Sequence, residues 1–456
     1  MNRFDEDVVV IGSGFGGSVS ALRLVEKGYR VRVREGGRRF EDNDFARTRW
    51  NLRRYLWAPA LGCFGVQRIH RLPHVMILAG AGVGGGSLNF ANTLYEPGSP
   101  FFNDPQWREI ADWAAELAPH YATAKRMLGV VEQYPHTGPV ERMMQGAAED
   151  LGVGSTFRRA PVGVFLGTPG VRVPDPFFGG EGPERTGCTL CGNCMVGCRV
   201  GAKNTLMKNY LALAERRGAQ IDALRTVTRV RELPDGGFAV TSRRSGAWAR
   251  PDERTITASK VVLAAGTWGT QQLLHRMRAS GDLPRVSSSI GVLTRTNSEA
   301  LDGAVATSVP VSAELTRGVA ITTSFHVDER THVENVRYGP GSNLMGALAT
   351  VMVPGELSFA GRLGRLFGQV LRHPVRQFRL GSLRRWSDRG IIALVMQTAD
   401  NSLTLSLRRR FGRDVLTSAQ GHGEPNPAHL PQAHRAARAI AARLEQEGGG
   451  PAEARG

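Results

Sequence analysis

The chain lacks any uninterrupted apolar run approaching the roughly twenty residues that are needed to span a bilayer. A first apolar strand pattern already begins at Val8, which leaves no room for the charged, apolar and cleavage regions of a signal peptide. Cysteine is scarce as well, because only five are present and four of them are bunched, unlike the framework of a secreted disulfide protein. These absences predict a cytoplasmic protein whose cysteines are ligands in a reducing compartment.

Acidic residues are also few, with 41 Asp and Glu against 58 Lys and Arg, so that the formal net charge is +17. A basic balance favours anionic partners such as phosphates, nucleic acid or lipid headgroups. Aromatic residues make up only 7% of the chain and no nucleic-acid-binding module is recognisable, so we expect no nucleic-acid partner. No internal repeat is present, and 456 residues predict a large core divided between two domains.

The strongest positive signal lies at the N-terminus. Residues 8–11 form a continuous apolar run, as is typical of a parallel strand that is buried on both faces. The motif Gly12-x-Gly14-x-x-Gly17 follows at once, and its glycines allow a tight turn, a close approach of backbone to a pyrophosphate, and close packing of helix on strand. A second predicted strand ends at Glu35, whose carboxylate can accept hydrogen bonds from ribose hydroxyls. Together these features predict a dinucleotide site that disfavours a 2′-phosphate.

Two further glycine turns follow apolar strands. Residues 75–79 run into the glycine-rich stretch 80–86, and Ser, Asn and Asn follow at positions 87, 89 and 92. A second close approach of backbone to a ligand explains this turn, and a flexible linker is the alternative. Residues 259–266 predict a buried strand that ends in glycine, before a helix over 270–277.

In their order and spacing, the three turns resemble those of the GMC oxidoreductases, and most closely the cholesterol-oxidase-like branch, over residues 1 to about 444. The resemblance implies an α/β fold with an FAD-binding Rossmann-like domain and an interleaved mixed-sheet substrate domain. It also implies bound FAD and the oxidation of a sterol-like or other hydrophobic alcohol to a carbonyl by hydride transfer to the flavin. The predicted units are an FAD-binding domain over 1–136 and 183–286, a substrate domain over 137–182 and 287–430, and a terminal helix with a disordered tail over 431–456.

The same resemblance assigns roles to residues of this sequence. It implies that the first turn holds the pyrophosphate, Glu35 the adenosine ribose, the second turn the flavin ring, and the backbone of Val227 the adenine. The predicted cofactor-binding residues are Gly12, Ser13, Gly14, Phe15, Gly16, Gly17, Glu35, Gly85, Gly86, Ser87, Asn89, Asn92, Val227 and Gly266.

No catalytic residue is predicted. In the family, the assisting His and its Asn or His companion lie in a C-terminal segment, whereas this chain runs from a helical pattern over 433–444 into a Gly-rich tail. His422 and His429 are interpreted as surface residues of a loop with prolines. Two alternatives to an alcohol oxidase therefore stay open: a catalytically incomplete flavin- or iron–sulfur-binding fragment, and a dehydrogenase of the same family that uses an acceptor other than dioxygen.

Four cysteines form a second motif. The run Cys188-x-x-Cys191-x-x-Cys194-x-x-x-Cys198 matches the ligand run of bacterial ferredoxin-type sites and predicts an iron–sulfur cluster, although Arg199 replaces the usual proline. Zinc is one alternative, but zinc sites normally join two cysteine pairs across a longer spacer. A merely buried helical stripe is the other, and the interspersed glycines argue against it. Cys63 is the remaining cysteine and a candidate further ligand.

A basic segment runs from Arg362 to Arg385, with seven arginines, no acid and interleaved apolar residues. Such a pattern predicts peripheral contact with an anionic membrane, here its inner face. The alternative is the solvated face of a core-packed helix that is kinked before Pro374.

Overall fold

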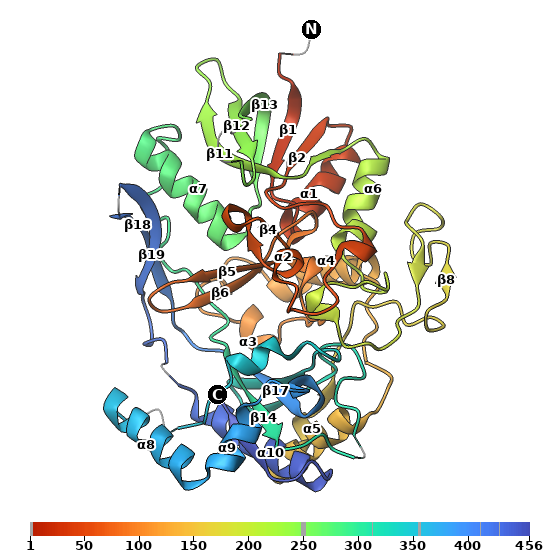
Figure 1. The fold of residues 1–456 in the computed structure, drawn as a ribbon. Coiled ribbons are helices and arrows are strands. Elements are labelled where there is room, and N and C mark those ends of the chain that lie inside the picture. The colour runs from red at the N-terminus through yellow and green to blue at the C-terminus, as the bar shows by residue number, and fades with distance from the viewer. Residues whose placement is uncertain (1–2, 248–251, 312, 354–356, 411, 428) are drawn as a thin grey trace.

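The structure is a computed structural model that describes residues 3–247, 252–311, 313–353, 357–410, 412–427 and 429–456. Two six-stranded sheets organise it, one above the other in Figure 1. The upper sheet has the order β10 (Gln220–Asp222), β2 (Val31–Arg34), β1 (Glu6–Ile11), β13 (Arg254–Leu263), β12 (Phe238–Arg244), β11 (Arg225–Glu232). The lower sheet has the order β20 (Ala452–Arg455), β14 (Ala300–Ala306), β17 (Gly390–Gln397), β16 (Thr331–Val336), β15 (Thr323–Asp328), β7 (Arg158–Arg159).

Four of the six strands of the upper sheet, β10, β2, β1 and β13, are parallel neighbours, and β12 and β11 are added antiparallel. Residues 8–11 of the central strand β1 are all apolar, and both faces of the strand are covered. Val8 and Val10 pack with helices α1 (Phe15–Val25) and α6 (Tyr210–Arg216), and Val9 packs with α7 (Gly266–Ser280) on the opposite face. The predicted buried parallel strand and the α/β class are therefore confirmed.

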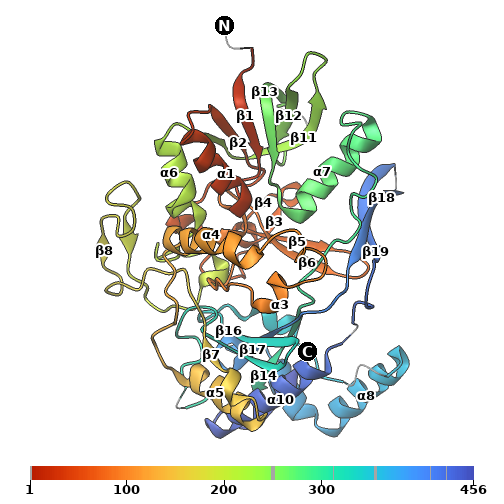
Figure 2. The same ribbon diagram turned by 180° about the vertical axis from the view of Figure 1, so that it is seen from behind.

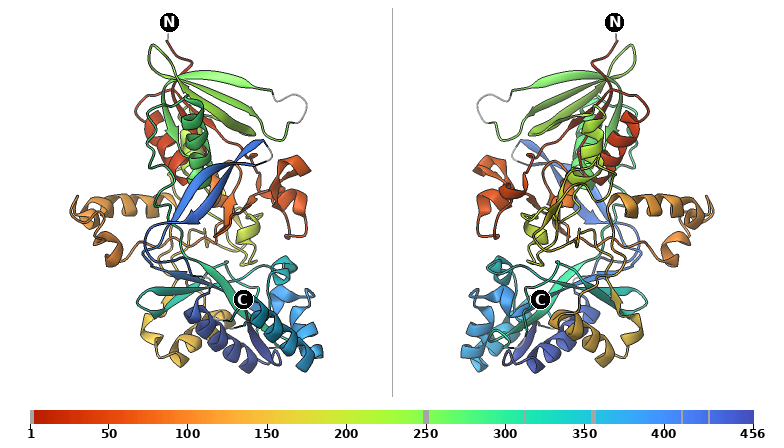
Figure 3. Two further views of the ribbon diagram at one scale, coloured as in Figure 1. Left: turned by 90° about the vertical axis from the view of Figure 1, so that its left-hand side faces the viewer. Right: turned by 90° about the vertical axis from the view of Figure 1, so that its right-hand side faces the viewer.

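The lower sheet is antiparallel and is covered on one face by α5 (Pro139–Asp150) and α10 (Pro431–Gln446). In the side views of Figure 3, α5 (yellow) and α10 (dark blue) lie at the bottom, on the side of this sheet away from the upper sheet. Strand residues alternate between the two faces. Thus Val333 packs with the helices, whereas Val336 packs with Leu88 and other residues between the two sheets.

The predicted disordered tail is wrong. Residues 452–455 form β20, which pairs antiparallel with β14 in the register Gly303↔Arg455 to Ala306↔Ala452. The glycines at positions 448–450 turn the chain back after α10, and Gly448 and Gly450 have positive φ angles of 82° and 68°. The tail is therefore an edge strand, because the free hydrogen-bonding groups of β14 offer it partners.

Further elements lie between or beside the two sheets. Figure 2 shows α3, α4 and the loops with β8 at the level between the sheets. Among the described residues, no helix has both the length and the apolar character that crossing a bilayer requires. The remaining elements are α2 (Leu52–Tyr55), β3 (Trp57–Ala58), β4 (Cys63–Phe64), β5 (Gln67–Arg71), β6 (Met76–Gly80), α3 (Ser99–Phe102), α4 (Trp113–Met127), β8 (Arg172–Val173), β9 (Arg185–Thr186), α8 (Phe359–Arg372), α9 (Pro374–Gly381), β18 (Leu403–Arg410) and β19 (Arg413–Gln420).

Candidate active site and cofactor sites

The three glycine turns meet at the carboxyl end of the parallel strands. A Cβ added to Gly12 would lie 2.3 Å from the carbonyl oxygen of Ala264, so the first and third turns touch through bare backbone. A Cβ added to Gly85 would lie 2.7 Å from the Cα atom of Gly14, so the second turn touches the first. The turns are thus neighbours in space although more than 240 residues separate the first from the third. In open α/β sheets, ligands bind at this edge.

The first turn has the features of an anion-binding site. Helix α1 starts at Phe15 without a side-chain cap, and its first turn contains no acidic residue. Its N-terminal amides and the positive end of its dipole can therefore act on a phosphate. The atom nearest to a Cβ added to Gly14 would be the Cα atom of Gly85, at 4.0 Å. The protein therefore leaves space beside the Gly14 backbone, which a ligand can approach closely. This arrangement fits the pyrophosphate of a dinucleotide.

Glu35 lies beside the first turn and forms hydrogen bonds with it. Its carboxylate accepts hydrogen bonds from the Ser13 hydroxyl at 2.7 Å, from the Ser13 amide at 3.1 Å and from the Gly37 amide at 2.7 Å. The Ser13 hydroxyl oxygen in turn accepts from the amide of Gly84 at 3.1 Å, which joins the first and second turns. Val227 lies on β11, whose first residue Arg225 donates its amide to the Glu35 carbonyl at 2.7 Å, so the predicted ribose and adenine contacts lie near each other.

The second turn is a short 3₁₀ helix, η3 (Gly85–Leu88), which includes Gly86. Two hydrogen bonds of Ser87 stabilise it. The Ser87 hydroxyl donates to the Gly84 carbonyl at 2.7 Å and accepts from the Leu206 amide at 3.0 Å. Asn89 donates its side-chain amide to Gln67 at 2.9 Å. The third turn ends at Gly266, the first residue of α7, with φ +70° and no atom within 4 Å of an added Cβ.

Asn92 differs from Asn89. Its side chain is completely buried, its backbone is left-handed with φ 74°, and neither its Nδ2 nor its Oδ1 atom has a hydrogen-bond partner in the described part of the chain. It lines a small cavity together with all four clustered cysteines: Cys188, Cys191, Cys194 and Cys198. The sequence grouped Asn92 with the flavin turn, and the structure also places it in the wall of the cysteine cavity.

The cysteine segment is looped. Only Cys194–Val196 forms a short 3₁₀ turn, so the alternative of a helical cysteine stripe is wrong. Burial raises the pKa of the Cys188 thiol to about 12 and that of Cys194 to about 11, and the neighbouring cysteines add to both shifts. Among the described residues, no three His, Cys, Asp or Glu side chains are grouped so that they could hold a single metal ion. Cys63 lies on β4 and is not one of the residues that line the cavity.

A buried carboxylate between the sheets was missed by the sequence analysis. Glu334 on β16 is 4% exposed and lies on the face opposite the helices, paired across strands with Ser324. Burial raises its pKa to about 7; the negative charge of Glu299 adds to the shift, and a hydrogen bond from Tyr95 opposes it. Tyr95 also packs edge-on against His332 with ring centroids 5.2 Å apart. A buried carboxyl with a raised pKa is a common feature of active sites.

The chain links Glu334 to the second glycine turn through Tyr95. Tyr95 follows η3 by seven residues, so the segment that leaves the second glycine turn reaches the sheet face that carries Glu334. Burial and the charge of His326 lower the pKa of His332 to about 4, which leaves His332 neutral at pH 7. A lone Glu in the strand pattern 331–336 gives no sequence signal, because its burial depends on β15, β17 and Tyr95.

Comparison with known proteins identifies the family. Residues 183–285 match the family model of the GMC oxidoreductases. The chain is 54% identical over 455 residues to the cholesterol oxidase of Mycobacterium tuberculosis, a match that covers 98% of this chain and 78% of that protein. The chain belongs to the GMC oxidoreductase family, in its cholesterol-oxidase branch. This GMC oxidoreductase is also 40% identical over 447 residues to a cholesterol oxidase of Acinetobacter baumannii, with 95% of this chain and 79% of that protein covered.

A solved structure shares the fold. The pyridoxine 4-oxidase from Mesorbium loti matches with a TM-score of 0.50 at 13% identity, over 97% of this chain and 80% of that one. At this identity the likeness concerns the fold alone. It agrees with the two-sheet architecture of this GMC oxidoreductase.

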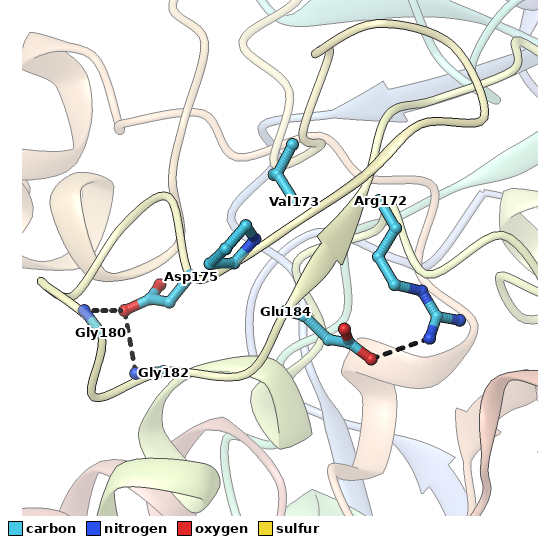
Figure 4. Close-up of a pocket in the computed structure, with 7 residues that line it drawn as sticks. Arg172, Val173, Asp175, Gly180, Gly182 and Glu184 are labelled. Carbon is cyan, nitrogen blue, oxygen red and sulfur yellow. Dashed lines mark hydrogen bonds and ion pairs between the residues drawn. The ribbon is translucent and has the colours of Figure 1, made fainter.

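A separate surface pocket of this GMC oxidoreductase lies within the excursion 172–184 (Figure 4). Its polar groups bind one another: the Asp175 carboxylate accepts from the amides of Gly180 and Gly182, and Arg172 pairs with Glu184 at 2.9 Å. None of the glycine turns lines it. This pocket is therefore separate from the meeting point of the three turns.

Proposed function

We propose that this protein oxidises the hydroxyl of a sterol-like or other hydrophobic alcohol to a carbonyl, with FAD as the hydride acceptor. The contact of the three glycine turns at Gly12, Gly85 and Ala264 carries this proposal, because an extended dinucleotide requires bare backbone at several distant points. The sterol class is supported by the 54% identical cholesterol oxidase. The same proposal includes a second cofactor, an iron–sulfur cluster on Cys188, Cys191, Cys194 and Cys198.

The residues of the chain divide the chemistry between them. Bound FAD would accept the hydride of the alcohol carbon, and the uncapped start of α1 would hold its pyrophosphate. Glu334 would take the hydroxyl proton on a carboxylate oxygen, and the Tyr95 hydroxyl would orient that carboxylate by its hydrogen bond. Ile392 and Leu394 lie on the same face of the neighbouring strand, in register with Val336 and Glu334, and would offer apolar contacts to a sterol.

The substitution Gly14→Ala tests the cofactor part of the proposal. Because the added methyl group meets no protein atom nearer than 4.0 Å, the fold should tolerate it, but the group occupies the space beside the expected pyrophosphate. We expect at least a tenfold weaker retention of FAD, which corresponds to about 1.4 kcal/mol or more. The measurement is the flavin absorbance per chain after dialysis, with circular dichroism as the check on folding.

Gly368→Ala is the matched control, since Gly368 lies on α8 and an added Cβ there also meets nothing within 4 Å. It should keep the flavin content of the parent protein. An unchanged flavin content in Gly14→Ala, or a parent protein that binds no FAD, would contradict the proposal.

We also propose that the protein contacts the inner face of a membrane through a basic helical arm, defined as α8 and α9. None of the described side chains of α8 is buried, whereas α9 buries Gln377 and Leu380, so the alternative of a core-packed helix applies to α9 and not to α8. The arm exposes Phe367, Leu371 and Phe378 at 57%, 78% and 80%, and no acid interrupts the arginines of 362–385. Such a surface suits the boundary between anionic headgroups and acyl chains, which is where a sterol would enter. In Figure 1, α8 projects from the lower part of the molecule.

The double substitution Leu371→Asp with Phe378→Asp tests the arm. We expect it to reduce binding to anionic phosphatidylserine vesicles at least tenfold in co-sedimentation at low salt, because it removes apolar contacts and adds negative charge. Ile110→Asp, at a residue that is 72% exposed elsewhere, should bind like the parent protein. If the parent protein stays in the supernatant with anionic vesicles, the membrane proposal fails.

A further inference from the structure

The backbone around the cysteine cavity, over residues 188–198, is irregular because several of its residues have positive φ angles. Leu190, Gly192 and Gly197 have positive φ angles of 57°, 68° and 98°, which turn the chain around the four thiols. A Cβ on Gly197 would lie 2.1 Å from the Phe45 ring, and one on Gly192 would lie 2.5 Å from the Thr316 carbonyl oxygen. The loop is therefore fixed from outside, while its cysteines line the space within it. A left-handed Leu is uncommon and indicates a specific local requirement.

Two buried basic side chains, Lys203 and Arg185, contact residues that line the cysteine cavity. Lys203 is 1% exposed and donates to the carbonyl oxygens of Cys194, Leu88 and Phe90 at 2.9, 3.0 and 2.6 Å. Lys203 lines the cavity together with the four cysteines. Arg185 is 2% exposed and donates to the carbonyl oxygen of Ala202, which lines the cavity, while its Nε and Nη1 atoms have no hydrogen-bond partner among the described residues. A buried cation is costly without a negative partner, so an anionic group among the cysteines would balance both.

Unused hydrogen-bonding groups face the same cavity. Both polar atoms of the Asn92 side chain are buried without a partner in the described structure, although Asn92 lines the cavity. Buried amides are normally satisfied, so these atoms point to a ligand. One sulfur already accepts a backbone hydrogen bond, since the Leu190 amide lies 3.4 Å from the Cys188 sulfur. Hydrogen bonds to sulfur are a feature of iron–sulfur sites.

We infer that Lys203, Arg185 and Asn92 complete an iron–sulfur site on the four cysteines, the two cations balancing an anionic cluster and Asn92 hydrogen-bonding to it. Each cysteine would exchange its thiol proton, released to water, for a bond from sulfur to one iron, without a change of oxidation state in the protein. In a four-iron cluster each iron takes its own cysteine, so the four sulfurs need not surround a single ion. The inference rests on the cofactor part of the proposed function.

The same lysine connects this site to the second glycine turn. Its ammonium group bonds the carbonyl oxygen of Leu88, the last residue of η3, and that of Phe90 just beyond. The cysteine loop and the turn that we expect beside the flavin thus share one side chain. The cluster would therefore lie next to the flavin site and not at a remote surface.

The decisive experiment measures iron, acid-labile sulfide, zinc and flavin per chain in the full-length protein, purified without oxygen from iron-supplied cells. Absorption and EPR spectra are recorded before and after reduction with dithionite. We expect several irons per chain with matching sulfide, and an EPR signal in one of the two oxidation states. Flavin-loaded protein without iron would overturn the cluster and leave the alcohol oxidation intact. Zinc without sulfide would also overturn it, whereas iron and sulfide without flavin would contradict the proposed function instead.

Three variants assign the residues. Cys191→Ser, at the exposed cysteine, should lose most of the iron and sulfide, whereas Cys63→Ser, outside the cavity, should keep both. Lys203→Met, which keeps the length of the side chain but removes its charge, should lower the iron content or shift the cluster potential to a more negative value. Circular dichroism and flavin content show whether each variant folds. Equal iron and sulfide in folded Cys191→Ser and parent protein, or an unchanged content and potential in Lys203→Met, would refute these assignments.

Discussion

Glu334→Gln is expected to lower kcat by about 10²- to 10⁴-fold, the range that a general base contributes. The amide keeps the shape of the side chain and can still bond to Tyr95, but it cannot take up the hydroxyl proton. The parent enzyme should show kcat/KM that rises with pH through about 7, because the carboxyl must be ionised to act and burial holds its pKa near that value. Steady-state kinetics with cholesterol between pH 5 and 9 measure both effects, and flavin content confirms that the variant is loaded.

Glu299→Gln is the matched variant. Its negative charge helps to raise the pKa of Glu334, so its removal should move the rising limb of the pH profile to lower pH while kcat stays within a few-fold of the parent value. If Glu334→Gln keeps both the rate and the pH profile of the parent enzyme, Glu334 is not the base.

Gly12→Ala should largely prevent formation of the flavin-loaded protein. The backbone has φ +100°, and a left-handed conformation costs a residue with a Cβ about 1–2 kcal/mol. In addition, the Cβ would lie 2.3 Å from the Ala264 carbonyl oxygen, and such overpacking costs about 1–3 kcal/mol or more. Denaturant titration should therefore show a fall of about 3 kcal/mol or more in the free energy of unfolding, with loss of bound flavin.

Gly28→Ala separates the conformational cost of an added Cβ from the cost of its steric contact. Gly28 also has a positive φ, +83°, but an added Cβ would meet nothing within 4 Å. Its cost should stay near the conformational part alone, about 1–2 kcal/mol. Equal destabilisation of the two variants would show that the contact between the first and third turns contributes little.

Much of the upper sheet could be predicted because local patterns and final burial agree there. The run 8–11 is apolar throughout, and the structure buries it on both faces. The predicted helix over 270–277 lies within α7, and the predicted strand over 259–266 overlaps the end of β13. The end of the chain was mispredicted because its local pattern and its final burial disagree. Polar and small residues at 452–455 carry no strand pattern of their own, and the open edge of β14 recruits them.

The sequence by itself determined which residues the proposed cofactor sites draw on, because glycines at fixed spacing provide local backbone freedom and four cysteines in eleven residues provide candidate ligands. Only the tertiary structure decided what lies beside them. The pKa of Glu334 depends on burial between strands and on Tyr95 and Glu299, which are 239 and 35 residues away along the chain. Lys203 likewise becomes the neighbour of both the cysteine loop and the second glycine turn only through folding. Desolvation and charge coupling arise from packing in space, so no local pattern can carry them.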